Sequence, residues 1–83
     1  MPIRAYVFMN TNPATAREAA EAVSKIDGVM STDVTTGRFD IVAVVDSDRL
    51  DLSSLENLIM TVRRVPGVIK TETAISTSKF VHH

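Results

Sequence analysis

The chain repeats its own pattern after 39 positions, and this internal repeat limits the possible folds more than any other feature. The segment Asp27-Gly28-Val29 falls on Pro66-Gly67-Val68 when the sequence is shifted by that distance. The apolar positions before it also coincide, since Ala16, Ala19, Ala20, Val23 and Ile26 fall on Leu55, Leu58, Ile59, Val62 and Val65. Few residues are identical, but each half has helical apolar spacing followed by a glycine and a β-branched segment. The chain therefore consists of two similar halves.

Local signals give the order of elements in these halves. Dense β-branched and aromatic residues predict strands at 3–9, 29–35, 38–45 and 68–77. Asn12-Pro13 is typical of a helix start and Asp27-Gly28 of a helix end. Ser53 and Glu56 have the spacing of a capping box, which predicts that a second helix begins at Ser53 and ends at Pro66-Gly67. The order βαββαβ predicts an α+β, ferredoxin-like domain, with a four-stranded antiparallel sheet and both helices on one face.

The third predicted strand is apolar on both sides. An antiparallel sheet with one face in water alternates apolar and polar residues, but this strand would place Phe39, Ile41, Ala43 and Val45 on one face and Val42 and Val44 on the other. The first strand likewise sets Ile3, Val7 and Met9 against Tyr6 and Phe8. Scattered exposed apolar residues are ordinary, but these strands are neighbours in such a fold, so we expect one patch that a second subunit buries.

Composition excludes several classes of function. The 83 residues form one domain, 1–83, with a net charge of −1 and no cysteine. Neither nucleic acid nor an anionic membrane is an expected partner, and no apolar segment is long enough to span a bilayer. With no signal peptide pattern, the expected location is the cytoplasm. The final His82-His83 resembles the remnant of a tag and is given no role.

The signals for catalysis or metal binding are weak. The only histidines are terminal, there is no cysteine to pair with them, and three glycines form no phosphate loop. The acidic group Asp46, Asp48 and Asp51 lacks the glycine and glutamate of a calcium loop and reads as a solvated connection. Arg63-Arg64 reads as favourable charge near a helix C-terminus. We expect no metal, no cofactor and no enzymatic activity.

Two segments could bind a small molecule. Gly37 permits a turn with positive φ where backbone N–H groups can hold a carboxylate, and Asp40 can accept hydrogen bonds from an ammonium group. The alternative is a hairpin turn that the aspartate stabilises. Thr71 and Thr73 share one face of the last strand and offer paired hydroxyls, although threonine also simply favours strands.

Three motifs in register resemble a known family. Thr36-Gly37-Arg38-Phe39-Asp40, Val65-Pro66-Gly67-Val68 and Thr71-Glu72-Thr73, spread over residues 3–77, resemble the effector-binding (RAM) domain of the Lrp/AsnC (feast/famine) transcription regulators. The resemblance implies dimers with sheets packed face to face, assembled into octamers or decamers, with small effectors, usually amino acids, bound between dimers. By matching position, the turn of Gly37 and Asp40 is expected to hold the head group, Arg38 is a further expected ligand-binding residue, and Thr71 and Thr73 line the same pocket.

The regulators of that family carry an N-terminal helix-turn-helix domain, whereas this sequence starts at the first strand. It therefore resembles the stand-alone members, which are expected to bind an amino acid, to form mixed assemblies with full-length Lrp/AsnC-type regulators, or both. Direct nucleic-acid binding is not expected, because no segment can place a recognition helix in a major groove.

Other readings of the same order of elements remain open. ACT-type sensor domains share it, but they favour sheets side by side, which leaves the second apolar face without a reason. A cofactor-independent dimeric α/β-barrel oxygenase shares face-to-face sheets, but usually needs His, Trp or Asn in a pocket, and this chain has no tryptophan and no internal histidine. A ligand-free oligomerisation module is the third alternative.

Overall fold

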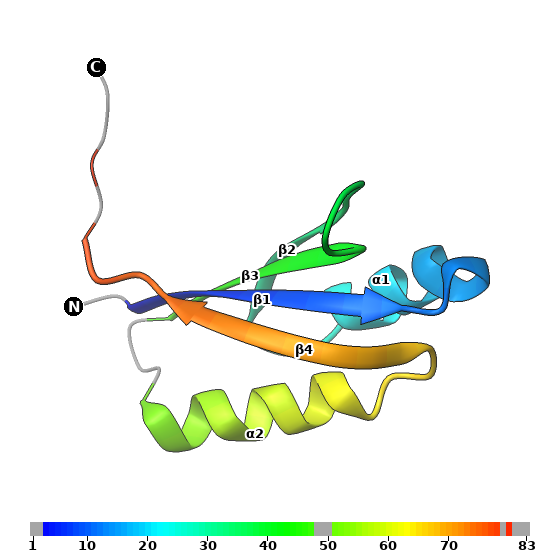
Figure 1. Cartoon of the computed structure of the whole chain (residues 1–83). Helices are drawn as coiled ribbons and strands as arrows, with labels where there is room; N and C mark the ends of the chain where they lie inside the picture. Colours follow the sequence, from blue (N-terminus) through cyan, green and yellow to red (C-terminus); the bar gives the residue numbers. More distant parts are fainter. Residues whose placement is uncertain (1–2, 48–50, 79, 81–83) are drawn as a thin grey trace.

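The computed structural model describes residues 3–47, 51–78 and 80. Along the chain these form β1 (Ile3–Thr11), a single 3-10 turn η1 (Pro13–Thr15), α1 (Ala16–Ser24), β2 (Val29–Val34), β3 (Ile41–Ser47), α2 (Leu52–Arg63) and β4 (Val68–Ile75). The strands pair antiparallel in the order β2-β3-β1-β4, and Figure 1 shows α2 running beneath β4. The predicted βαββαβ order and ferredoxin-like fold class are confirmed.

One hydrophobic core joins both helices to the same face of the sheet. The central strands bury alternate side chains completely, namely Ala5, Val7 and Met9 on β1 and Ile41, Ala43 and Val45 on β3. The helices contribute the apolar positions of the repeat, namely Ala19, Ala20, Val23, Leu55, Leu58 and Val62. Each large side chain removed from water in this way contributes about 1.5–3 kcal/mol, so the repeat positions fix how the helices lie on the sheet.

The two helices begin differently. The predicted start at Asn12 is confirmed for the 3-10 turn η1, since its side chain accepts a hydrogen bond from the N–H of Ala14 at 3.1 Å. Helix α1 itself begins three residues later than predicted, at Ala16, with Thr15 at its N-cap and no side-chain hydrogen bond there. The predicted start of α2 at Ser53 is wrong. The N-cap is Asp51, whose Oδ1 accepts from the N–H of Ser54 at 2.7 Å. Aspartate takes this place because its carboxylate both caps the first turn and meets the positive end of the helix dipole.

The cap at Asp51 gives a prediction for acid stability. The hydrogen bonds from Ser54 lower the pKa of Asp51, so the cap stabilises the fold above the pKa of the unfolded chain and is lost as the pH falls through the lower, folded value. Asp51→Asn caps the helix without titrating, so we expect its melting temperature to fall less than that of the parent as the pH is lowered below about pH 4. Thermal melts between about pH 7 and pH 2 measure this. Parallel curves for the two proteins would contradict it.

Strand ends differ from the prediction around the turn that joins β2 and β3. Residues 38–40, predicted as strand, belong to this turn. Thr35 closes the turn with two hydrogen bonds, both at 2.8 Å: its N–H donates to the carbonyl of Asp40 and its hydroxyl donates to the carbonyl of Phe39. Strand β3 instead continues to Ser47, where it pairs with the start of β1. The predicted side for Phe39 is therefore wrong, because a turn residue does not follow the alternation of a strand.

The tight turn between α2 and β4 contacts the start of the first helix. Gly67 has a φ of +95°, and its carbonyl accepts a hydrogen bond from the N–H of Asn12 at 2.9 Å. A Cβ added at Gly67 would lie 2.4 Å from the hydroxyl oxygen of Thr15. The start of the first helix and the end of the second therefore meet at a point that only glycine fits.

Candidate functional site

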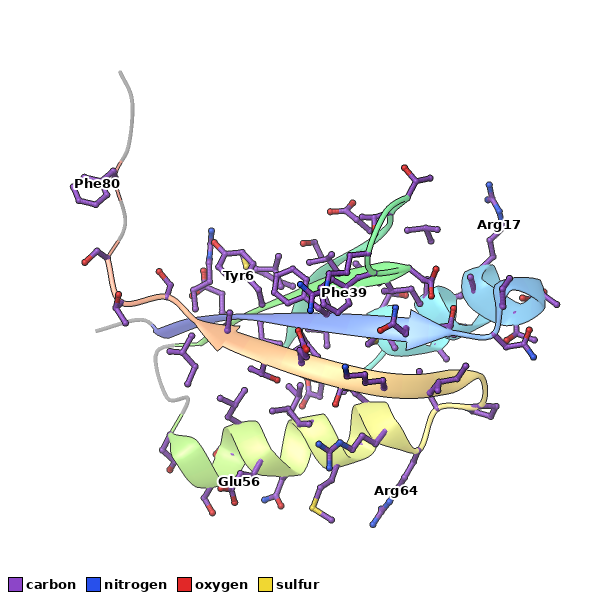
Figure 2. The ribbon with its side chains drawn as sticks, in the orientation of Figure 1. Tyr6, Arg17, Phe39, Glu56, Arg64 and Phe80 are labelled. Carbon is purple, nitrogen blue, oxygen red and sulfur yellow. The ribbon has the colours of Figure 1, made fainter. Side chains whose placement is uncertain are left out.

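The face of the sheet away from the helices carries an apolar patch. We call this the open-face patch, and its members are Tyr6, Phe8, Phe39, Val42 and Val44, all half-buried. Val42 pairs with Phe8 and Val44 with Tyr6 across the two central strands. The rings of Phe8 and Phe39 lie 5.1 Å apart, and Figure 2 shows Tyr6 and Phe39 on the side opposite α2. The predicted apolar character of this face is confirmed, except for the expected side of Phe39 and for Ile3, whose side chain lies outside the described residues.

Polar groups surround the open-face patch. At one end Arg4 donates to Asp46 at 2.7 Å, with the two side chains 29% and 22% exposed, and this hydrogen bond is the main cause of the raised pKa of Arg4. At the outer strand Lys70 lies 3.6 Å from Glu72. An apolar centre with a polar rim is the usual organisation of a protein–protein interface.

The turn at residues 36–40 is held by hydrogen bonds to the end of β1. The carboxylate Oδ2 of Asp40 accepts from the backbone N–H of Thr11 at 2.8 Å, and the side-chain amide of Asn10 donates to the carbonyl of Arg38 at 2.9 Å. Gly37 has a φ of +120° and open space around it. Asp40 therefore stabilises the turn, while its Oδ1 has no donor among the described residues.

This bond gives a prediction for stability. Asp40→Ala leaves the part-buried N–H of Thr11 without its acceptor, so we expect it to lower the free energy of unfolding by about 1–2 kcal/mol. Asp40→Asn keeps a side-chain carbonyl at the same place and should lose less than half of that. Urea denaturation of both variants compares them. Equal losses would mean that the charge, and not the hydrogen bond, is what the turn needs.

The predicted threonines lie on the opposite side of the sheet from the open-face patch. Thr71 pairs with Met9 and Thr73 with Val7, and both partners are buried in the core, so these threonines face the side of the sheet that α2 covers. Asp40 accepts its hydrogen bond from Thr11 of β1. Strand β1 lies between β3 and β4, so it separates the turn from the strand that carries the threonines. Within one chain, the structure does not bring the turn and the threonines together.

A residue outside the predicted site lies beside Thr71. The Nε of Arg63, in the last turn of α2, donates to the hydroxyl of Thr71 at 3.2 Å. Sequence patterns assigned Arg63 only to the helix end, since nothing in the sequence links it to a strand residue eight positions away.

These two residues line a cavity at the outer edge of the sheet. Its volume is about 300 Å³, and its lining consists of Arg63, Val68, Ile69, Lys70 and Thr71. The pairing of β4 with β1 skips Ile69, because Val68 pairs with Thr11 and Lys70 with Asn10. This irregularity leaves Ile69 73% exposed. The cavity thus combines apolar walls with a hydroxyl and a guanidinium group.

The described residues were also searched for a metal site and for a membrane-spanning helix. Across residues 3–47, 51–78 and 80, no three His, Cys, Asp or Glu side chains gather closely enough to hold a metal ion, and no helix there has the length and apolar content to cross a membrane. Asp48, His82 and His83 lie outside the described residues.

Comparison with known proteins identifies similar sequences. Residues 4–83 match the family model of the Lrp/AsnC ligand binding domain. The HTH-type transcriptional regulator LysM of Sulfurisphaera tokodaii is 36% identical over 74 residues, which are 88% of this chain and 51% of that protein. The chain therefore spans about half the length of the curated relative it matches.

Solved structures share the fold. The protein TTHA0845 from Thermus thermophilus superposes with a TM-score of 0.85 at 23% identity, covering 96% of this chain and 99% of that one. The transcriptional regulator NMB0573 from Neisseria meningitidis, solved as a complex with L-Met, gives a TM-score of 0.81 at 22% identity, covering 96% of this chain and 53% of that one. At these identities the likeness shows the fold.

Proposed function

Because the chain belongs to the Lrp/AsnC family through its ligand-binding domain, we propose that it is a regulatory module that binds a small-molecule effector, and that this effector is an amino acid. The family match carries the proposal, since it covers residues 4–83 and describes a domain that binds a ligand. The L-Met complex of NMB0573, a protein of the same fold, supports an amino acid as the class of effector.

The effector is proposed to lie between subunits. Gly37, Arg38 and Asp40 of one subunit hold the amino-acid head group, for which the Oδ1 of Asp40, without a donor among the described residues, offers an acceptor to the ammonium. Thr71 and Thr73 of another subunit line the same site. This division follows from their separation within one chain, where β1 stands between them. A ligand held by so few groups binds with about −4 to −8 kcal/mol, which is millimolar to micromolar affinity.

Self-association is proposed to use the open-face patch. A domain of this size buries only about 60–65% of the surface of its unfolded chain, so covering the patch with a second copy adds the burial that the fold alone lacks. The two sheets then pack face to face, and dimers assemble further into an octamer or a decamer. The effector site lies where dimers meet.

The module is proposed to regulate and not to catalyse. It acts in the cytoplasm and influences transcription through mixed assemblies with full-length Lrp/AsnC-type regulators, without direct contact to nucleic acid. The curated relative LysM, a transcriptional regulator by name, supports this role.

Calorimetric titration with each of the twenty amino acids tests the proposal, with the mass followed by light scattering in the same samples. Saturable heat with one or a few amino acids, together with a change in assembly, is the expected result. No heat with any amino acid, from a folded multimer, would overturn the effector proposal and leave an oligomerisation module without a ligand.

A further inference from the structure

The cavity between the end of α2 and the start of β4 suggests which amino acid the module binds. We propose that this cavity takes the carboxylate side chain of an acidic amino acid, glutamate or aspartate, and that Arg63 selects it. The inference rests on the proposed function, because it assumes that the head group of the effector is held by the turn of another subunit.

Arg63 is oriented for such a role by its neighbour. Its Nε donates to the hydroxyl of Thr71 at 3.2 Å, which fixes one edge of the planar guanidinium on β4. A guanidinium has five N–H donors, so the four on its two terminal nitrogens remain for a ligand. Among the described residues no carboxylate oxygen comes within 4.0 Å of Arg63. A planar, pre-positioned pair of donors suits a carboxylate, which it can bind with two parallel hydrogen bonds.

The charges around the cavity favour an anion. None of the five lining residues is acidic, so an ammonium or guanidinium side chain finds no partner there and is repelled. Lys70 also lines the cavity, but its ammonium lies 3.6 Å from Glu72. Arg64 follows Arg63 in sequence but does not line the cavity, and Figure 2 shows it pointing away from the sheet. Among the described residues, Arg63 is therefore the one lining cation without a carboxylate partner.

The size of the cavity fits a short side chain. A volume of about 300 Å³ lies at the lower end of the range for small-molecule sites. Val68 and Ile69 supply an apolar wall for one or two methylene groups, and Arg63 lines the same cavity. A neutral amide has the same shape as the acid but forms weaker hydrogen bonds with a cation, so charge and not size separates glutamate from glutamine.

Titration of three proteins with matched ligands tests this inference. The parent chain, Arg63→Gln and Arg64→Gln are titrated with L-glutamate, L-glutamine and glutarate. We expect the parent to bind glutamate about 10- to 100-fold more tightly than glutamine. Arg63→Gln should remove this preference with little change for glutamine. Arg64→Gln, which makes the same charge change one residue away, should retain the preference.

The outcomes separate this inference from the proposed function. Equal affinity of the parent for glutamate and glutamine would overturn the inference, and so would an equal loss of both in Arg63→Gln, which would place the α-carboxylate at Arg63. Amino-acid binding would stand in either case. Binding of glutarate that shifts the backbone NMR signals of Ile69 and Thr71, and that Arg63→Gln abolishes, supports the cavity even if no amino acid binds. That last pattern would reject an amino acid as the effector, and with it the choice of glutamate, while Arg63 would stand as the residue that binds a carboxylate in the cavity.

Discussion

Replacing Val44 with aspartate is expected to prevent the self-association proposed above and to leave a monomer of 9.1 kDa. Val44 belongs to the open-face patch and is paired with Tyr6 on one side and Ser31 on the other. A carboxylate there stays hydrated in the monomer but is buried without a partner if a second sheet covers the patch. That costs several kcal/mol, which weakens association by at least about 100-fold. Light scattering across a dilution series measures the change.

Met60→Asp is the matched control for this experiment. Met60 lies on the outer face of α2 and is 51% exposed, so it receives the same chemical change away from the patch. It should assemble like the parent, and circular dichroism should show that both variants are folded. Loss of assembly in Met60→Asp, or its retention in a folded Val44→Asp, would mean that the subunits associate through another surface.

Gly67→Ala is expected to lower the free energy of unfolding by about 2–4 kcal/mol, or the melting temperature by about 10–20 °C. One part of the loss comes from the backbone, because a residue with an L side chain adopts the φ of +95° found at Gly67 only with strain. The other part is the new Cβ, 2.4 Å from the hydroxyl oxygen and 3.3 Å from the Cβ of Thr15. Relief by moving the turn would break the hydrogen bond from Asn12.

Gly37→Ala separates the two parts. Its φ is +120°, but nothing lies within 4 Å of an added Cβ, so only the backbone strain applies and about 1–2 kcal/mol should be lost. The additional loss in Gly67→Ala then reports the contact with Thr15. Combining Gly67→Ala with Thr15→Gly should recover much of that additional loss. If the two alanine variants are equally stable, the contact at Thr15 relaxes freely and our account of the turn is wrong.

The sequence predicted the fold well because its signals are local or periodic. The repeat positions became the buried faces of both helices, and the spacing of apolar residues needs no knowledge of contacts. The start of α2 was missed because Asp51 and Ser53 are both good capping residues, and residue type alone does not decide which of them caps the helix. Phe39 was placed on the wrong side because residues 38–40 are not strand.

The candidate site was less predictable, since it depends on distances between elements. The sequence pointed to the turn and to the threonines, but it could not show that β1 separates them. It also could not pair Arg63 with Thr71, because that contact is set by how α2 lies on β4. Helix and strand periodicity predict which face of its own element a residue lies on. Which residue of another element it contacts follows only from the packed structure.

The place of β1 has a consequence for how the chain folds. Strand β1 precedes its partners in the chain, lies inside the sheet and pairs with both β3 and β4. Its two partners lie roughly 40 and 65 residues further along the chain, and contacts this distant in sequence slow folding because long loops must close first. A nascent chain cannot complete its sheet until β4 has left the ribosome. Until then, one full edge of β1 is exposed to other strands, which makes aggregation during synthesis the main hazard for this small domain.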